Sequence, residues 1–250
     1  CREGGVVEDC VISNNVISGN TMIGAGVAIT TPNGRLTRSL VCANGETGQG
    51  KANGAVYVQQ GGLVDDCLVM SNSTTSGAAI TIGSSATVAN CTVVGNFRSS
   101  GGAGLYYNAE GSAVVENCVF AGNVSGSEPG SFGGYPEWNA RLERNTSGAI
   151  TANAYPSLTN GVKNCVFVQC VPVGEGSFTC EDAKFVDEAA GDYRITLDSP
   201  LRFKGLYEDW MASATDIRRD PEFPRSVDGK VDMGCYQGCV PEPGFMLLFR

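Results

Sequence analysis

Two carboxylates, Asp65 and Glu116, are the residues of this sequence whose type and spacing best suit acid–base chemistry. They belong to a row of outward-facing positions that lies two residues before a recurring cysteine or serine. The row reads Glu8, Thr37, Asp65, Ala89, Glu116 and Lys163. Paired carboxyl groups can act as general acid and general base, but two strand spacings place Asp65 and Glu116 about 10 Å apart, slightly more than inverting glycosidases use. The pair is a candidate catalytic site in a row that is sparse in carboxylates.

Histidine is absent from the sequence, which excludes Ser–His and Cys–His catalysis and removes the commonest metal ligand. The cysteines contain no CxxC pair, so their spacing is unlike that of a zinc site. We therefore expect neither a metal centre nor a cofactor.

Residues 124–148 interrupt the regular pattern and combine aromatic with charged side chains. The candidate contact residues are Phe132, Tyr135, Trp138, Arg141 and Arg144. Insertions in repeat proteins map to loops, and loops on rigid scaffolds often carry function. The segment is a candidate glycan-binding or partner-contact loop. The alternative is that its aromatic side chains cover the outside of the scaffold or pack against a neighbouring molecule.

The elements that must position these residues come from one repeated phrase, seen as VVEDCVISNN, LVDDCLVMSN, TVANCTVVGN and VVENCVFAGN. Its anchor residues are Cys10, Ser39, Cys67, Cys91, Cys118 and Cys165. The first four intervals between them are 29, 28, 24 and 27 residues, and the last is 47. A strand-rich period in the twenties indicates a solenoid with one coil per repeat.

Two apolar positions flank each anchor, three residues before it and two after it. The first row is Val7, Leu36, Val64, Val88, Val115 and Val162, and the second is Ile12, Val41, Val69, Val93, Phe120 and Phe167. Between them the alternation slips by one at an Asn or Asp that tolerates the left-handed conformation of a sharp bend. Each phrase is therefore predicted to be two short strands meeting at a bend, with Asp66 serving such a bend.

A second row of asparagines lies five residues after the anchors. These are Asn15, Asn44, Asn72, Asn96 and Asn123, and stacked in successive coils they can hydrogen-bond along the solenoid axis. A glycine-led third strand follows in each coil. The pattern over residues 4–170 resembles the right-handed parallel β-helix of pectate-lyase-like proteins of the bacterial surface. We expect an all-β fold, with coils over residues 1–180 and three strands per coil.

The cysteines fall into two groups. The anchors Cys10, Cys67, Cys91, Cys118 and Cys165 point inward and are predicted to form a reduced packing ladder, since coils lie about 4.8 Å apart and disulfide Cβ atoms about 3.8 Å. The disulfide candidates are Cys1, Cys42, Cys170, Cys180, Cys235 and Cys239. The local pairings are Cys170–Cys180 and Cys235–Cys239, while Cys1 and Cys42 pair with each other or with another chain.

Residues 181–240, the cap segment, resemble the closing segment of bacterial surface β-helix proteins. The matching residues are Asp192, Tyr193, Ser199, Pro200, Asp216, Pro224, Arg225, Asp232, Gly234 and Tyr236. The resemblance implies an irregular cap that shields the end of the solenoid. Residues 241–250 partly resemble a PEP-type sorting signal, which implies export; the alternative is a docking tail.

Composition limits the partners. A net charge of −9 disfavours nucleic acid, and there is no apolar run long enough to cross a bilayer. The first functional hypothesis is an exported cell-surface or extracellular protein with a structural or adhesive role, whose copies stack head to tail into filaments. The alternatives are a polysaccharide lyase or hydrolase using Asp65 and Glu116, and a non-catalytic glycan-binding β-helix.

Overall fold

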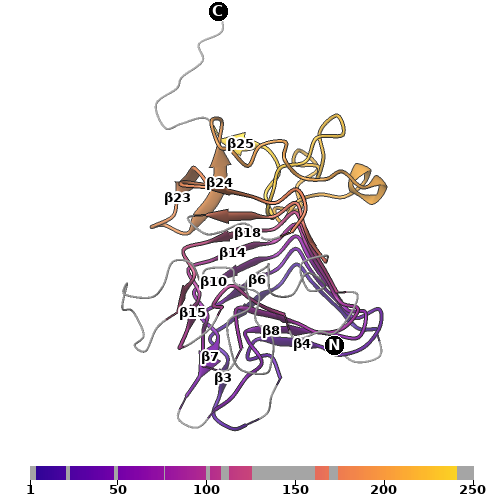
Figure 1. Ribbon diagram of the computed structural model, residues 1–250. Helices are drawn as coiled ribbons and strands as arrows, with labels where there is room; N and C mark the ends of the chain where they lie inside the picture. The colour runs from indigo at the N-terminus through magenta and orange to yellow at the C-terminus, as the bar shows by residue number, and fades with distance from the viewer. Residues whose placement is uncertain are drawn as a thin grey trace, which may run out of the picture.

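The chain winds into a parallel β-solenoid in a computed structural model. The structure describes residues 4–20, 23–47, 50–75, 77–99, 102–107, 113–125, 161–168 and 174–240. The aromatic insertion proposed above, with Phe132, Tyr135, Trp138, Arg141 and Arg144, lies outside the described residues, as do Cys1, Cys170 and the tail 241–250. Figure 1 shows the coils stacked so that equivalent strands form flat faces.

Within the described residues, successive coils build four parallel sheets. Sheet 1 holds β1 (Val6–Glu8), β5 (Arg35–Thr37), β9 (Leu63–Asp65), β13 (Thr87–Ala89), β17 (Val114–Glu116) and β20 (Val162–Lys163). Sheet 2 holds β2 (Val11–Ser13), β6 (Leu40–Cys42), β10 (Leu68–Met70), β14 (Thr92–Val94), β18 (Val119–Ala121), β21 (Val166–Val168) and β22 (Phe178–Cys180). Sheet 3 holds β3 (Val16–Ile17), β7 (Gly45–Glu46), β11 (Ser73–Thr74), β15 (Phe97–Arg98) and β19 (Val124–Ser125). Sheet 4 holds β4 (Val27–Ile29), β8 (Val56–Val58), β12 (Ile80–Ile82) and β16 (Leu105–Tyr107).

The all-β solenoid expected from the repeat is confirmed, with one correction to the coil. Each of the first four coils has four strands rather than three, because a two-residue strand of sheet 3 follows each ladder asparagine. Strands this short leave no alternating pattern in the sequence.

The two apolar rows predicted beside the anchors line the inside of the solenoid. Val64 pairs in register with Leu36 and Val88, and Val69 pairs with Val41 and Val93, so that equivalent side chains stack from coil to coil. These residues join the side chains of sheet 4 in one buried apolar cluster. The anchor thiols of Cys67, Cys91, Cys118 and Cys165 are buried in the same cluster, whereas Cys10 is exposed in the first coil.

The bends between sheets 1 and 2 have the left-handed backbone that the Asn/Asp row predicts. The φ angles of Asp66, Asn90 and Asn117 are 49°, 51° and 53°. Asp9, Arg38 and Asn164 occupy the same position in their coils with φ of 58°, 43° and 52°. We call these six residues the bend row. Arg38 shows that the position accepts a long side chain when the coil geometry demands a positive φ.

The asparagine ladder forms a continuous chain of hydrogen bonds at the next turn. The Asn72 side-chain oxygen accepts from the backbone and side-chain nitrogens of Asn44 at 2.9 and 3.0 Å, and Asn72 donates in the same way to Asn96 at 3.0 and 2.9 Å. Asn15 and Asn123 continue the pattern at its two ends. The ladder therefore satisfies buried turn amides that have no partner in a sheet.

The cap segment lies along the side of the solenoid rather than only across its end. Its elements are β23 (Phe185–Asp187), β24 (Asp192–Thr196), the 3₁₀ helix η2 (Asp209–Ala212) and β25 (Cys239–Val240). Figure 1 shows it, in orange and yellow, over the outer face of sheet 2. There Tyr193, Leu201 and Met233 join Leu68 and Val119 in a second buried cluster. Among the residues that the structure describes, no helix has the length and apolar character that a membrane crossing requires.

Candidate functional site

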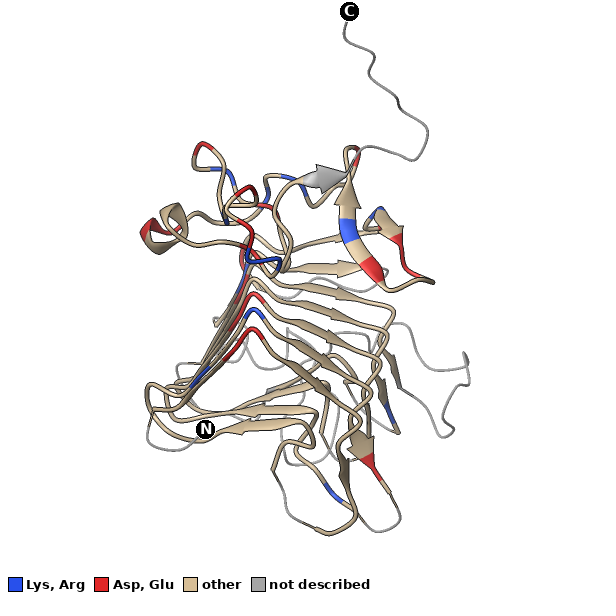
Figure 2. Ribbon diagram, turned by 180° about the vertical axis from the view of Figure 1, so that it is seen from behind, with Lys and Arg blue, Asp and Glu red and all other residues tan. Residues whose placement is uncertain are grey.

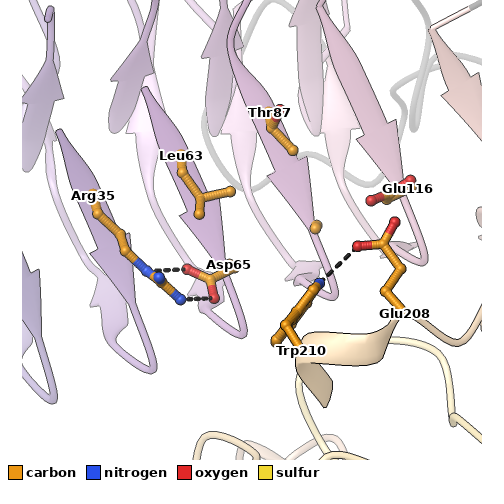
Figure 3. A pocket seen from close by; sticks show the side chains of 8 residues that line it. Arg35, Leu63, Asp65, Thr87, Glu116, Glu208 and Trp210 are labelled. Atoms are coloured by element: carbon orange, nitrogen blue, oxygen red, sulfur yellow. Dashed lines mark hydrogen bonds and ion pairs between the residues drawn. The ribbon is translucent and has the colours of Figure 1, made fainter. Parts of the chain in front are cut away.

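A pocket of about 300 Å³ opens where the cap segment meets the outer face of sheet 1. The solenoid contributes Arg35, Leu63, Asp65, Thr87, Ala89 and Glu116, and the cap segment contributes Glu208 and Trp210. Figure 3 shows these side chains converging from the strands of sheet 1 and from the cap segment. The pocket has the size of a small ligand site, and it brings together both carboxylates that the sequence nominated.

Asp65 is held by Arg35, which lies one coil before it at the start of β5. The Arg35 Nε and terminal nitrogen donate to the two Asp65 oxygens at 3.2 and 2.7 Å, a bidentate geometry. Asp65 is buried, and burial raises the pKa of its carboxyl group, while the charge and hydrogen bonds of Arg35 act in the opposite direction. Asp65 therefore has its charge compensated inside the protein.

Glu116, two coils further along, pairs with Lys163 at 2.7 Å between Nζ and Oε2. Hydrogen bonding to Glu116, with a further contribution from the charge of Glu208, raises the pKa of Lys163. Figure 3 shows the carboxyl groups of Glu116 and Glu208 pointing toward one another. Lys163 is therefore paired with Glu116, and Glu208 acts on it only through its charge.

Trp210 forms the rim of the pocket at the start of η2. Its indole nitrogen donates to Glu208 Oε2 at 2.7 Å, which fixes the ring against the carboxylate, while 38% of the residue stays exposed. The pocket therefore combines an accessible aromatic surface with several hydrogen-bond acceptors, a pairing that suits an amphipathic polar ligand.

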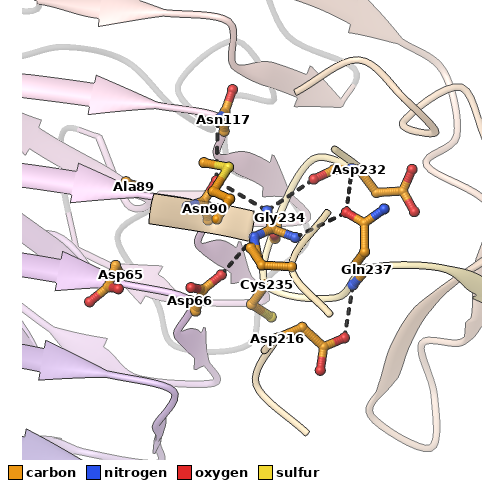
Figure 4. Close-up of polar contacts among 12 residues, drawn as sticks. Asp65, Asp66, Ala89, Asn90, Asn117, Asp216, Asp232, Gly234, Cys235 and Gln237 are labelled. Atoms are coloured by element: carbon orange, nitrogen blue, oxygen red, sulfur yellow. Dashed lines mark hydrogen bonds and ion pairs between the residues drawn. The ribbon is translucent and has the colours of Figure 1, made fainter. Parts of the chain in front are cut away.

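A second polar cluster, drawn in Figure 4, joins the cap segment to the bend row. Arg225 is fully buried and pairs with Asp66 at 2.9 Å, and it also donates to Asn90 Oδ1 at 3.0 Å. It donates further to the carbonyls of Asp232 and Gly234 at 3.0 and 2.8 Å. Because Asp66, Asp216 and Asp232 are also buried, this cluster fastens the cap segment and is closed to ligands.

The contacts of the cap segment extend along most of the bend row. Arg219 pairs with Asp9 at 3.0 Å. Asn117 exchanges two hydrogen bonds with the Leu206 backbone, at 3.0 and 2.8 Å. Asn164 donates to the Lys204 carbonyl at 2.5 Å. Figure 2 shows the charged residues following one another along this corner of the solenoid.

The structure gives no support to the predicted disulfides. Cys42, Cys180 and Cys235 are free thiols, and Cys235 is buried beneath the cap segment. Burial raises the pKa of the Cys235 thiol well above its ordinary value. Cys239 lies in β25, and its predicted partner Cys235 is free.

Sequence reasoning found half of the pocket and missed the other half. It placed Asp65 and Glu116 in one outward row, but it did not assign Arg35, Glu208 or Trp210 a role. A tryptophan next to two acidic residues in GLYEDWMAS was the available signal. Within the described residues, no cluster of three or more potential ligands is arranged to hold a metal ion.

The architecture and this pocket define the chain as a parallel β-solenoid with a laterally docked cap segment. No protein-family model, curated protein or solved structure matches the chain. The resemblance to pectate-lyase-like surface proteins therefore has support in its solenoid architecture alone.

Proposed function

We propose that this protein is an extracellular or cell-surface adhesive β-solenoid that binds carbohydrate in the pocket between sheet 1 and η2. The single observation behind the proposal is the exposed Trp210 ring beside acceptor groups of Glu208, Glu116 and Asp65 in one pocket. The C–H face of a sugar ring packs on an aromatic surface, and its hydroxyl groups donate to carboxylates.

Binding is favoured over glycan cleavage because two of the three carboxylates are already engaged. Asp65 is held in a bidentate pair by Arg35, and Glu116 is paired with Lys163. A general acid or base needs a carboxyl group free to exchange a proton with the substrate. The carboxyl groups of Asp65 and Glu116 are instead held in fixed positions, from which their oxygens can accept hydrogen bonds from a ligand.

The test is a panel of glycans titrated against the wild-type protein and Trp210→Ala by calorimetry. We expect binding of at least one glycan, weakened about tenfold or more in Trp210→Ala. Phe203→Ala, which removes an exposed aromatic ring that does not line the pocket, is the matched control and should bind normally. A glycan that the wild type cleaves and Asp65→Asn does not would replace binding with hydrolysis or lysis.

Head-to-tail assembly into filaments is the second candidate, and it rests on the first coil. In the described residues β1, β2, β3 and β4 are the end strands of their sheets, and an uncovered strand edge is a template for pairing with another chain. Val6, Val11 and Val16 on these strands are 57%, 68% and 58% exposed. A non-closing contact between unlike ends generates a filament.

Negative-stain electron microscopy tests this assembly. We expect fibres from the wild type and isolated rods from Val11→Lys, since a charge on an edge strand blocks pairing. Leu197→Lys adds the same charge at an exposed apolar position of the cap segment and should leave fibres intact. Rods alone in every sample would reject the filament.

The proposed location rests on the acidic composition and on the resemblance of residues 181–250 to exported surface proteins. The thiols of Cys42, Cys180 and Cys235 are free, so among the described residues no disulfide adds to the argument for an oxidising compartment.

A further inference from the structure

Negative charges outnumber positive charges around the pocket. This excess affects which class of carbohydrate can bind there. Asp65, Glu116 and Glu208 line the pocket with one cation, Arg35, and Lys163 pairs with Glu116 beside it. The three carboxylates therefore outnumber these two cations by one. Arg35 is committed to Asp65 through two hydrogen bonds. Lys163 is paired with Glu116, so the carboxylate left without an ion pair among these three is that of Glu208.

The excess negative charge lies where the substituents of a bound sugar ring can reach it. The Glu116 side chain is 8% exposed and reaches the pocket from the floor of sheet 1, while Glu208 reaches it from the cap segment beside Trp210. A ligand ring resting on Trp210 would bring its substituents within reach of Glu208, because the indole nitrogen is hydrogen-bonded to that carboxylate at 2.7 Å. A cationic substituent there would gain both ionic and hydrogen-bond contact.

From this geometry we infer that the pocket selects glycans carrying free amino groups, such as oligomers of glucosamine, over neutral or acidic glycans. The inference rests on the proposed carbohydrate binding and names its ligand class. The ammonium group of such a sugar binds between Glu208 and Glu116 and neutralises the negative charge that Lys163 does not. The sugar ring packs against Trp210. Uronic acid or sulfated glycans are disfavoured, since they add negative charge to a pocket lined by three carboxylates and one cation, in a chain with a net charge of −9.

A sugar fits the remaining lining better than a lysine side chain does. Thr87 offers a hydroxyl group, and Leu63 and Ala89 offer apolar surface next to the aromatic ring. A ring with hydroxyl groups on its edge and C–H groups on its face uses all of these, whereas the aliphatic stem of a lysine has no donor or acceptor for the Thr87 hydroxyl group.

The experiment compares a glucosamine hexamer, its fully N-acetylated counterpart, a galacturonate hexamer and a tetralysine peptide, by calorimetry at mildly acidic pH. Acetylation removes the charge of the amino group and keeps the sugar ring. We expect the wild type to bind the glucosamine hexamer about tenfold more tightly than the acetylated hexamer, with the galacturonate hexamer binding least. Glu208→Gln should abolish that preference, because it removes the charge that attracts the ammonium group and keeps an oxygen that can accept from the Trp210 indole nitrogen.

The control for non-specific attraction is Glu222→Gln, which removes the same charge from an exposed position of the cap segment that does not line the pocket. It should keep the full preference. Equal binding of the two hexamers, or a preference that survives Glu208→Gln, overturns the amino-sugar inference. Tetralysine binding that exceeds the glucosamine hexamer and depends on Glu208 reassigns the pocket to a basic peptide and also overturns it.

The failure of the inference is distinguishable from the failure of the proposed function. If Trp210→Ala weakens binding of the neutral hexamer, carbohydrate binding stands even where the amino-sugar preference is absent. If no glycan responds to Trp210→Ala, both fall together.

Discussion

Arg225 is a buried cation whose removal should be among the most costly single changes in this chain. Its guanidinium group serves Asp66, Asn90 and two backbone carbonyls, so Arg225→Met leaves several buried acceptors without a donor. We expect a loss of about 3–5 kcal/mol in the free energy of unfolding, measured by urea denaturation. Arg219→Met, which breaks the half-exposed pair with Asp9, is the matched control and should cost less than about 1 kcal/mol. Similar losses in the two variants would show that the buried cluster contributes no more to the free energy of unfolding than the half-exposed ion pair does.

Asp66 should make the stability of the protein depend on pH. Burial raises the pKa of this carboxyl group from an ordinary 3.8 to about 8, against the lowering influence of Arg225, while Asp65 and Asp216 raise it further and Arg38 lowers it. Because its folded-state pKa exceeds the unfolded value, the folded protein binds more protons between these pH values, and the contribution of Asp66 to stability falls as pH rises from about 4 to about 8.

Asp66→Asn isolates this contribution, since asparagine occupies the same bend position at Asn90 and keeps the positive φ. We expect the stability of the wild type, relative to Asp66→Asn, to decrease with rising pH across that window and to level off above it. Urea denaturation at a series of pH values measures the difference, in which the other carboxylates cancel. A difference that stays flat from pH 4 to 8 would mean that Asp66 has the same pKa in both states.

At the scale of elements, the asparagine ladder should contribute most to stability in the middle of the solenoid. Asn72→Ala removes buried hydrogen bonds to Val41, Met70 and Asn96, and leaves the Asn44 amide without its acceptor. We expect a loss of about 2–4 kcal/mol in urea denaturation. Asn15→Ala, at the exposed end of the same ladder, should cost less than about 1 kcal/mol because water replaces the lost partners. Equal costs would indicate that the ladder acts through turn propensity alone.

The sequence predicted the elements well where one coil repeats the next. The inward rows, the bend row and the ladder each recur at a fixed offset from the anchor, so a local pattern was enough to place Val64, Asn90 or Asn72. The two-residue strands of sheet 3 were missed, since Gly45–Glu46 and Ser73–Thr74 have no shared pattern of side chains.

The pocket was only half predictable because it depends on where the cap segment docks. Asp65 and Glu116 share a repeat row, but Glu208 and Trp210 come from a non-repeating segment with no periodic relation to that row. Likewise, resemblance singled out Asp216, Arg225 and Gly234 without showing what they contact. In the structure Gly234 has a φ of 87°, and a side chain there would clash with Thr92, so these residues are explained by tight docking on the solenoid.

At the scale of the whole molecule, the cap segment joins coils that otherwise contact only their neighbours. Solenoids commonly behave as chains of nearest-neighbour interactions, in which end coils can unfold separately. Here Arg219 reaches the first coil, Arg225 the third and fourth, Leu206 the fifth and Lys204 the sixth. The second apolar cluster adds contacts with the outer face of sheet 2. These long-range links should make the solenoid and cap segment unfold together.

Trp210 provides a local probe for this prediction. The sequence has two tryptophans, and Trp138→Phe leaves the one in the cap segment. In that background we expect urea transitions followed by Trp210 fluorescence and by far-ultraviolet circular dichroism of the strands to coincide. Adding Arg225→Met should lower both midpoints equally, because the cluster it breaks is shared. A fluorescence transition that precedes the loss of strand signal would instead mean that the cap segment detaches from an intact solenoid, and the pocket would then be lost before the fold.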